Sequence, residues 1–257
     1  MDYDIGFWGY AALVVGGVAA GNGSAITLSL LMMLGLPAGW ANATNRIGVV
    51  FQTITAIISI RKLEGATGLF KASRFLIIPS ILGSGLGAWL ASKTGDHGMS
   101  TFIGIVMIFL LVTLFLNPKR WANDTDWTKK KNTPQLAVFF FFIGLYAGYI
   151  QMGIGIMMLA VLVLYSRYSL IDANIVKLLM AAVFVIPAFV VFYLNGKMHW
   201  PSGIALAVGQ SLGAWIGGRY LLSHPKAAKW IRILLIVILS LAILSIFGIF
   251  DFLSHLL

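Results

Sequence analysis

Two glycine-rich breaks interrupt the apolar runs of this chain, and their residue types suit the binding of an anion. The residues are Gly21, Asn22, Gly23 and Ser24 in the first break and Gln151, Gly153 and Gly155 in the second. Glycine permits a sharp turn and leaves backbone amides uncovered. A helix that begins at such a break directs free N–H groups and the positive end of its dipole toward it. We therefore interpret both breaks as candidate anion-binding sites, with close helix packing as the structural alternative.

Two basic residues lie within apolar segments and could add charge to such a site. Arg46 follows Asn42 and Asn45, and Lys177 follows Asn174. A basic residue in an apolar segment is costly and is by default a functional hypothesis. The alternative is that both side chains extend to the lipid headgroups from a segment end. Their matching positions in the two halves of the chain favour contact with a substrate or its pathway.

Acidic and thiol groups are missing where catalysis or ion coupling would need them. The chain has no cysteine, and none of its acidic residues falls in the middle of an apolar segment. The usual carboxylate of a proton relay or Na⁺ site is therefore absent, as are Ser/His and paired-carboxylate arrangements. We expect no cofactor, no metal and no enzymatic activity, and the basic residues favour an anionic cargo.

Composition places the chain in a membrane. Of its 257 residues, 60% are hydrophobic and 10% are charged, whereas soluble domains carry about 25% charged residues. The net charge of +10 could suggest nucleic acid, but the basic residues occupy short gaps between apolar runs, as membrane topology requires. We predict an all-α polytopic membrane protein whose partners are a small anion and the lipid bilayer, with no nucleic acid. Whether the protein forms a homodimer is left open by the sequence.

An internal duplication divides the chain into two repeats. Leu86-Gly87-Ala88-Trp89 recurs as Leu212-Gly213-Ala214-Trp215, and the spacing of glycines 16, 21 and 23 recurs at 148, 153 and 155. Arg46 falls opposite Lys177 in the same order. Several matches in one order indicate duplication. We predict a first transmembrane repeat over 1–117, a linker over 118–134 and a second repeat over 135–257, together forming one membrane domain.

Each repeat contains an odd number of apolar segments. They lie near 5–20, 24–36, 43–62, 70–92 and 99–117, and near 135–151, 154–166, 173–194, 201–220 and 229–250. Five segments per repeat place the second copy upside down relative to the first. With the linker in the cytoplasm, most basic residues face inside and only Lys93 and Lys197 face outside, as the positive-inside rule requires. We predict a multi-pass protein of the bacterial plasma membrane.

The segments 24–36 and 154–166 are too short for a full crossing at 1.5 Å per residue. We interpret them as half-helices that meet at the glycine breaks, either as re-entrant hairpins or as short tilted spans. Short, Gly-interrupted segments at matching positions of two inverted halves indicate the binding site of a transporter. The sequence thus predicts a substrate held near the midplane between the two breaks.

The order of the motifs also carries a family resemblance. In the first half they are Gly16–Ser24, Leu34-Gly35-Leu36-Pro37 and Ala41-Asn42-Ala43-Thr44-Asn45-Arg46. In the second half they are Gly144–Gly155, Asp172-Ala173-Asn174 with Lys177-Leu178-Leu179, Asn195-Gly196 and Gly209–Gly218. This pattern resembles the sulfite exporter TauE/SafE family. The resemblance implies export of sulfite or a small organosulfonate such as sulfoacetate from the bacterial cytoplasm.

Two departures from the family pattern leave the individual cargo open. The first glycine run is less glycine-rich than in many members, and the second break carries Gln151-Met152. A channel-like permease for another small oxyanion and a non-transporting membrane scaffold are the alternatives. The direction of net flux and the coupling are open as well.

Overall fold

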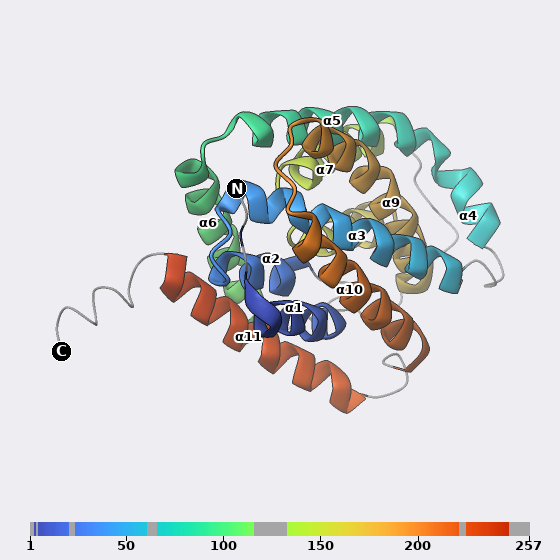
Figure 1. Cartoon of the computed structure of the whole chain (residues 1–257). Coiled ribbons are helices and arrows are strands. Elements are labelled where there is room, and N and C mark those ends of the chain that lie inside the picture. Colours follow the sequence, from blue (N-terminus) through green and yellow to red (C-terminus); the bar gives the residue numbers. More distant parts are fainter. Residues whose placement is uncertain are drawn as a thin grey trace.

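The computed structural model describes residues 3, 5–20, 24–60, 66–115, 133–220 and 225–246, and in this part of the chain every regular element is helical. Figure 1 shows the helices packed around one another, with α2 near the middle. The α-helices are α1 Gly6–Ala20, α2 Ser24–Met33, α3 Ala38–Ile60, α4 Ala66–Ser73, α5 Ile77–Lys93, α6 Asp96–Phe115, α7 Pro134–Tyr149, α8 Ile154–Leu159, α9 Leu170–Leu194, α10 Trp200–Tyr220 and α11 Pro225–Ile246. A 3-10 turn, η1 Arg74–Leu76, joins α4 to α5, and a π-helical turn, η3 Ala160–Tyr165, follows α8.

The predicted apolar segments correspond to these helices, with two differences. Helix α3 begins at Ala38 rather than near 43, so Arg46 lies more than two turns inside it. The predicted segment 70–92 is not one α-helix but α4, η1 and α5 in succession. Pro79 explains the interruption, because it has no N–H to donate to the carbonyl of Phe75 and its ring crowds that carbonyl.

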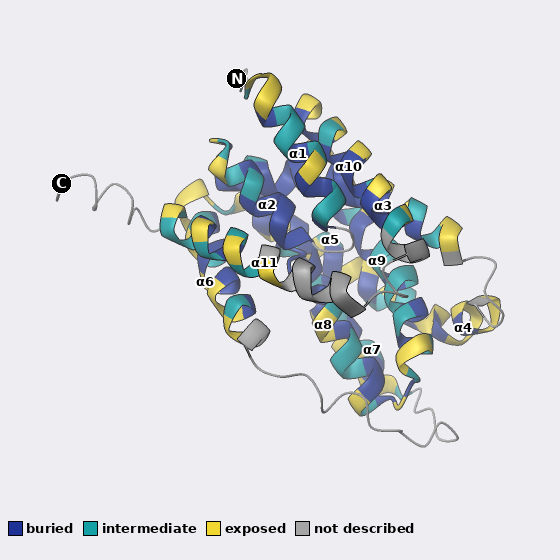
Figure 2. Cartoon of the chain, turned by 90° about the horizontal axis from the view of Figure 1, so that it is seen from below, coloured by how far each residue is buried: buried dark blue, intermediate teal, exposed yellow. Residues whose placement is uncertain are grey.

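The outer surface of the bundle is apolar. Large side chains such as Trp8 (81% exposed), Ile171 (73%) and Leu194 (75%) face outward, and Figure 2 shows exposed residues on the outer faces of the helices. Two described helices, Thr67–Lys93 and Leu170–Leu194, are long and apolar enough to cross a membrane. Exposed apolar surface on this scale is expected where lipid replaces water. The all-helical structure therefore has the character of a membrane protein.

Two close helix pairs join the first half of the chain to the second. Helix α1 packs along α10, and α7 packs along α5. Glycines make both approaches possible: a Cβ at Gly87 would overlap the carbonyl of Leu145, and one at Gly213 would lie 2.5 Å from the Val18 carbonyl oxygen. These glycines therefore serve close helix packing.

We expect Gly87→Ala to destabilise the protein by about 1–3 kcal/mol, because the added methyl group meets backbone that cannot rotate away. The matched control is Gly85→Ala on the same helix, where a Cβ would meet nothing within 4 Å. Thermal unfolding in detergent should show a lower melting temperature for the Gly87 variant alone. Equal melting temperatures for the two variants would contradict the packing assigned to α5 and α7.

Candidate functional site

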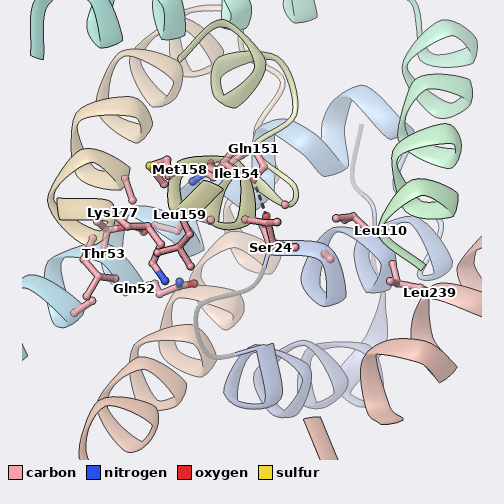
Figure 3. A pocket seen from close by; sticks show the side chains of 18 residues that line it. Ser24, Gln52, Thr53, Leu110, Gln151, Ile154, Met158, Leu159, Lys177 and Leu239 are labelled. Atoms are coloured by element: carbon pink, nitrogen blue, oxygen red, sulfur yellow. Dashed lines mark hydrogen bonds between the residues drawn. The ribbon is translucent and has the colours of Figure 1, made fainter. Parts of the chain in front are cut away.

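The start of α2, at the end of the first break, lies against the second break. Ser24 is the first residue of α2, and its hydroxyl donates to the carbonyl oxygen of Gln151 at 3.3 Å. Figure 3 shows this bond beside the start of α8. Gly21, Asn22 and Gly23 lie outside the described residues. The contact between the two breaks that the structure describes is therefore the one between Ser24 and Gln151.

The second break reverses the chain through two left-handed residues. Gln151 has a φ of 60° and Gly153 a φ of 76°. Glycine adopts this conformation readily, but a glutamine does so at a cost of order 1 kcal/mol. The hydroxyl of Tyr146 donates to the carbonyl of Met152 at 2.6 Å and helps to hold the turn. A strained residue held in this way indicates a position that its surroundings determine strongly.

A cavity of ≈ 300 Å³ lies where the breaks meet. Five of the predicted site residues line it: Ser24, Gln151, Gly153, Gly155 and Lys177. Two further polar residues that sequence reasoning missed, Gln52 and Thr53, complete its polar wall. The remaining lining residues are apolar: Ala25, Val49, Ala56, Leu110, Ile154, Ile156, Met158, Leu159, Leu178, Ala181 and Leu239.

Lys177 brings positive charge to this cavity. It lies on α9, and its ammonium group donates to the side-chain oxygen of Asn174 at 2.8 Å. Asn174 in turn donates to the carbonyl of Leu170 at 2.8 Å, so its amide is fixed on the helix. An ammonium group has three donors, and this bond uses one of them. No Asp or Glu is among the described residues that line the cavity, so the local charge favours an anion.

Arg46, the counterpart of Lys177 in the duplication, has a different environment. It is completely buried. Its guanidinium donates to the carbonyls of Ala147 at 2.7 Å and Gly148 at 3.0 Å, and also to the side-chain oxygen of Gln151. Carbonyls in the last turn of a helix lack intrahelical partners, and a cation there also meets the negative end of the dipole. Arg46 therefore caps α7 and holds the second break, and it does not extend to lipid headgroups.

The asparagines predicted beside Arg46 also hold the scaffold. Asn42 donates to the carbonyl of Tyr149 at 2.7 Å and accepts from Arg46 at 3.3 Å. The side-chain oxygen of Asn45 accepts from Thr27 at 2.7 Å and from Gln210 at 3.3 Å. One face of α3 is thus bonded to α7, α2 and α10. The structure places Asn42, Asn45, Arg46 and Asn174 outside the set that lines the cavity, and their predicted contact with a substrate stays a prediction.

The sequence contains a pattern from which Thr53 and Gln52 could have been predicted as site residues. Val49 and Thr53 follow Arg46 by three and seven positions, so they continue the face of α3 on which Arg46 lies. Both line the cavity, and the hydroxyl of Thr53 donates to the carbonyl of Val49 at 2.6 Å. Extending the polar face of α3 by two turns would have found Thr53, and Gln52 stands beside it.

Comparison with known proteins gives a consistent result over most of the chain. A family model described as sulfite exporter TauE/SafE matches residues 5–246. The probable membrane transporter protein YfcA of Escherichia coli (strain K12) is 26% identical over 219 residues, covering 85% of this chain and 80% of the relative. The probable membrane transporter protein ORF9 of Sinorhizobium sp is 27% identical over 238 residues, covering 91% of this chain and 88% of the relative. No solved structure is significantly similar.

Proposed function

This chain belongs to the sulfite exporter TauE/SafE family and is a membrane transporter, and on that basis we propose that it exports a small sulfur-containing anion such as sulfite or an organosulfonate like sulfoacetate. The observation that carries this proposal is Lys177 in a cavity where the two breaks meet. An oxyanion can accept several hydrogen bonds at once, and bonds between charged partners are the strong kind. The start of α2 at Ser24 adds the positive end of its dipole near the middle of the cavity.

We further propose that two inverted repeats, 1–117 and 135–257, build this site in the bacterial plasma membrane, with the linker 118–134 in the cytoplasm. Most of that linker, 116–132, lies outside the described residues. The helix pairs α1–α10 and α7–α5 support the proposal, because equivalent copies related by a two-fold axis exchange partners in this way. Labelling of a single cysteine placed at position 125 in intact cells tests the topology, and reaction with an impermeant reagent would contradict it.

A ligand screen with the purified full-length protein tests the substrate class. We expect sulfite and sulfonates to raise the melting temperature and to show saturable flux in proteoliposomes, while acetate and sulfate do so less. Non-saturating flux of another oxyanion would favour the channel-like permease. Absence of flux for every anion would favour the membrane scaffold.

If the anion crosses the membrane without a coupling ion, the membrane voltage drives its export. Moving one elementary charge through 100 mV is worth about 2.3 kcal/mol, so the equilibrium ratio of a monovalent anion should change about fifty-fold per 100 mV. Potassium gradients with valinomycin can set the voltage across proteoliposomes while the anion is assayed on both sides. A ratio that does not respond to voltage would exclude uniport of a charged cargo.

A further inference from the structure

The side-chain donors among the described lining residues are two hydroxyls, the amides of Gln52 and Gln151, and one charged group, the ammonium of Lys177. The hydroxyls of Ser24 and Thr53 already donate to the carbonyls of Gln151 and Val49. The side-chain oxygen of Gln151 accepts from Arg46. Lys177 keeps two of its three ammonium donors after bonding Asn174. This donor set can satisfy one anionic head group at the Lys177 side of the cavity.

The charged lining residue lies at one side of the cavity, and the opposite side is apolar. Figure 3 shows Lys177, Gln52 and Thr53 on one side and Leu110 and Leu239 on the other, with Ser24 between them. Of the α8 residues, Ile154 lies near Gln151, whereas Met158 and Leu159 lie near Lys177. Transfer of apolar surface from water to such a wall is favourable, and burial of a charge there without partners is costly.

The size of the cavity exceeds that of a bare oxyanion. Water occupies about 30 Å³ in the liquid, so a cavity of ≈ 300 Å³ has room for roughly ten water-sized groups. A sulfur atom and its three oxygens fill less than half of this space. Roughly six non-hydrogen atoms could therefore occupy the apolar side.

From these observations we propose that the cavity takes an organic monoanion, with its acidic head at Lys177 and an apolar group of about six carbon atoms against Leu110 and Leu239. This inference rests on the proposed function and narrows its class of cargo to organic anions, because bare sulfite would leave the apolar side of the cavity empty. A dianion such as sulfate or sulfoacetate is disfavoured, because its second charge has no cationic partner among the described lining residues. Within the proposed class of cargo, the inference therefore favours sulfonates that carry a single charge.

A series of alkanesulfonates from methanesulfonate to octanesulfonate tests the proposal by binding to the purified protein. Burial of a methylene group contributes about 0.8 kcal/mol, so each added carbon should tighten the dissociation constant about fourfold, up to about six carbons. Hexanoate should bind if the acidic head alone is recognised, and failure of hexanoate would assign the head group as a sulfonate. Sulfite that binds more tightly than hexanesulfonate would overturn the proposal.

Variants of the apolar wall separate binding in the cavity from partition into detergent. Leu110→Phe on α6 and Leu239→Phe on α11 both reduce the space on the apolar side, so each should weaken hexanesulfonate at least tenfold and leave methanesulfonate nearly unchanged. Leu241→Phe is the matched control, because Leu241 also lies on α11 and faces outward. If both cavity variants kept the chain-length dependence of the parent protein, the inference would be overturned. Saturable sulfite flux with no chain-length dependence would overturn the inference alone, whereas absence of flux for every anion would remove the proposed function as well.

Discussion

Replacement of Lys177 by methionine should weaken anion binding about ten- to hundredfold, because a hydrogen bond to a charged group is worth about 1.5–3 kcal/mol. Lys177 lines the cavity and is partly exposed to it, so the variant should still fold. Isothermal titration with sulfite or a sulfonate measures the effect, and a melting curve without ligand checks the fold. Lys177→Arg keeps the charge and should retain part of the affinity.

The matched control for this experiment is Lys93→Met. Lys93 is exposed at the end of α5, away from the cavity, and the same change in net charge occurs in both variants. An equal loss of binding in the two variants would show that overall charge, and not the cavity, attracts the anion. Unchanged affinity in Lys177→Met would remove Lys177 from the site.

Replacement of Arg46 by methionine should instead lower stability, by about 3–5 kcal/mol. The variant leaves the carbonyls of Ala147 and Gly148 and the side chain of Gln151 without their donor, and each buried group left unsatisfied costs about 1–3 kcal/mol. Relief from burying the guanidinium offsets part of this loss. Arg46→Lys should recover little, because an ammonium group lacks the planar fork that reaches several acceptors at once.

Stability and binding measured on the same variants separate the two roles. Arg46→Met is expected to lower the melting temperature strongly, and Lys177→Met is expected to leave it nearly unchanged. If Arg46→Met were as stable as the parent protein and failed only to bind anions, Arg46 would contact the cargo as the sequence predicts. That result would contradict its assignment as the cap of α7.

The sequence was most informative where a pattern has one physical cause. Glycines spaced four apart in two apolar segments are typical of close helix packing, and the structure shows Gly87 and Gly213 against backbone. The short segments predicted at 24–36 and 154–166 are observed as α2, with 10 residues, and as the 6-residue α8 followed by η3. The length and hydropathy of an apolar segment are read from the sequence itself, so the short helices could be predicted without knowledge of tertiary contacts.

The different roles of Arg46 and Lys177 could not be predicted in the same way. Their equivalent positions in the duplication indicate equivalent roles, but the role of each depends on which backbone it reaches. Arg46 reaches the last carbonyls of α7, whereas Lys177 lines the cavity. The start of α3 was also predicted late, because a helix beginning at Ala38 contains several polar residues that are satisfied only by tertiary partners such as Thr27 and Tyr149.

The glycine-lined helix pairs limit how the cavity can open. Each pair joins an early helix to a late one, α1 to α10 and α5 to α7, with backbone against backbone. The early and late parts of the chain are therefore interlocked, and rocking them apart as two rigid bodies would disrupt both contacts. We expect alternating exposure of the cargo to come from smaller movable gates, with the short α8 and its π-helical continuation as the natural hinge.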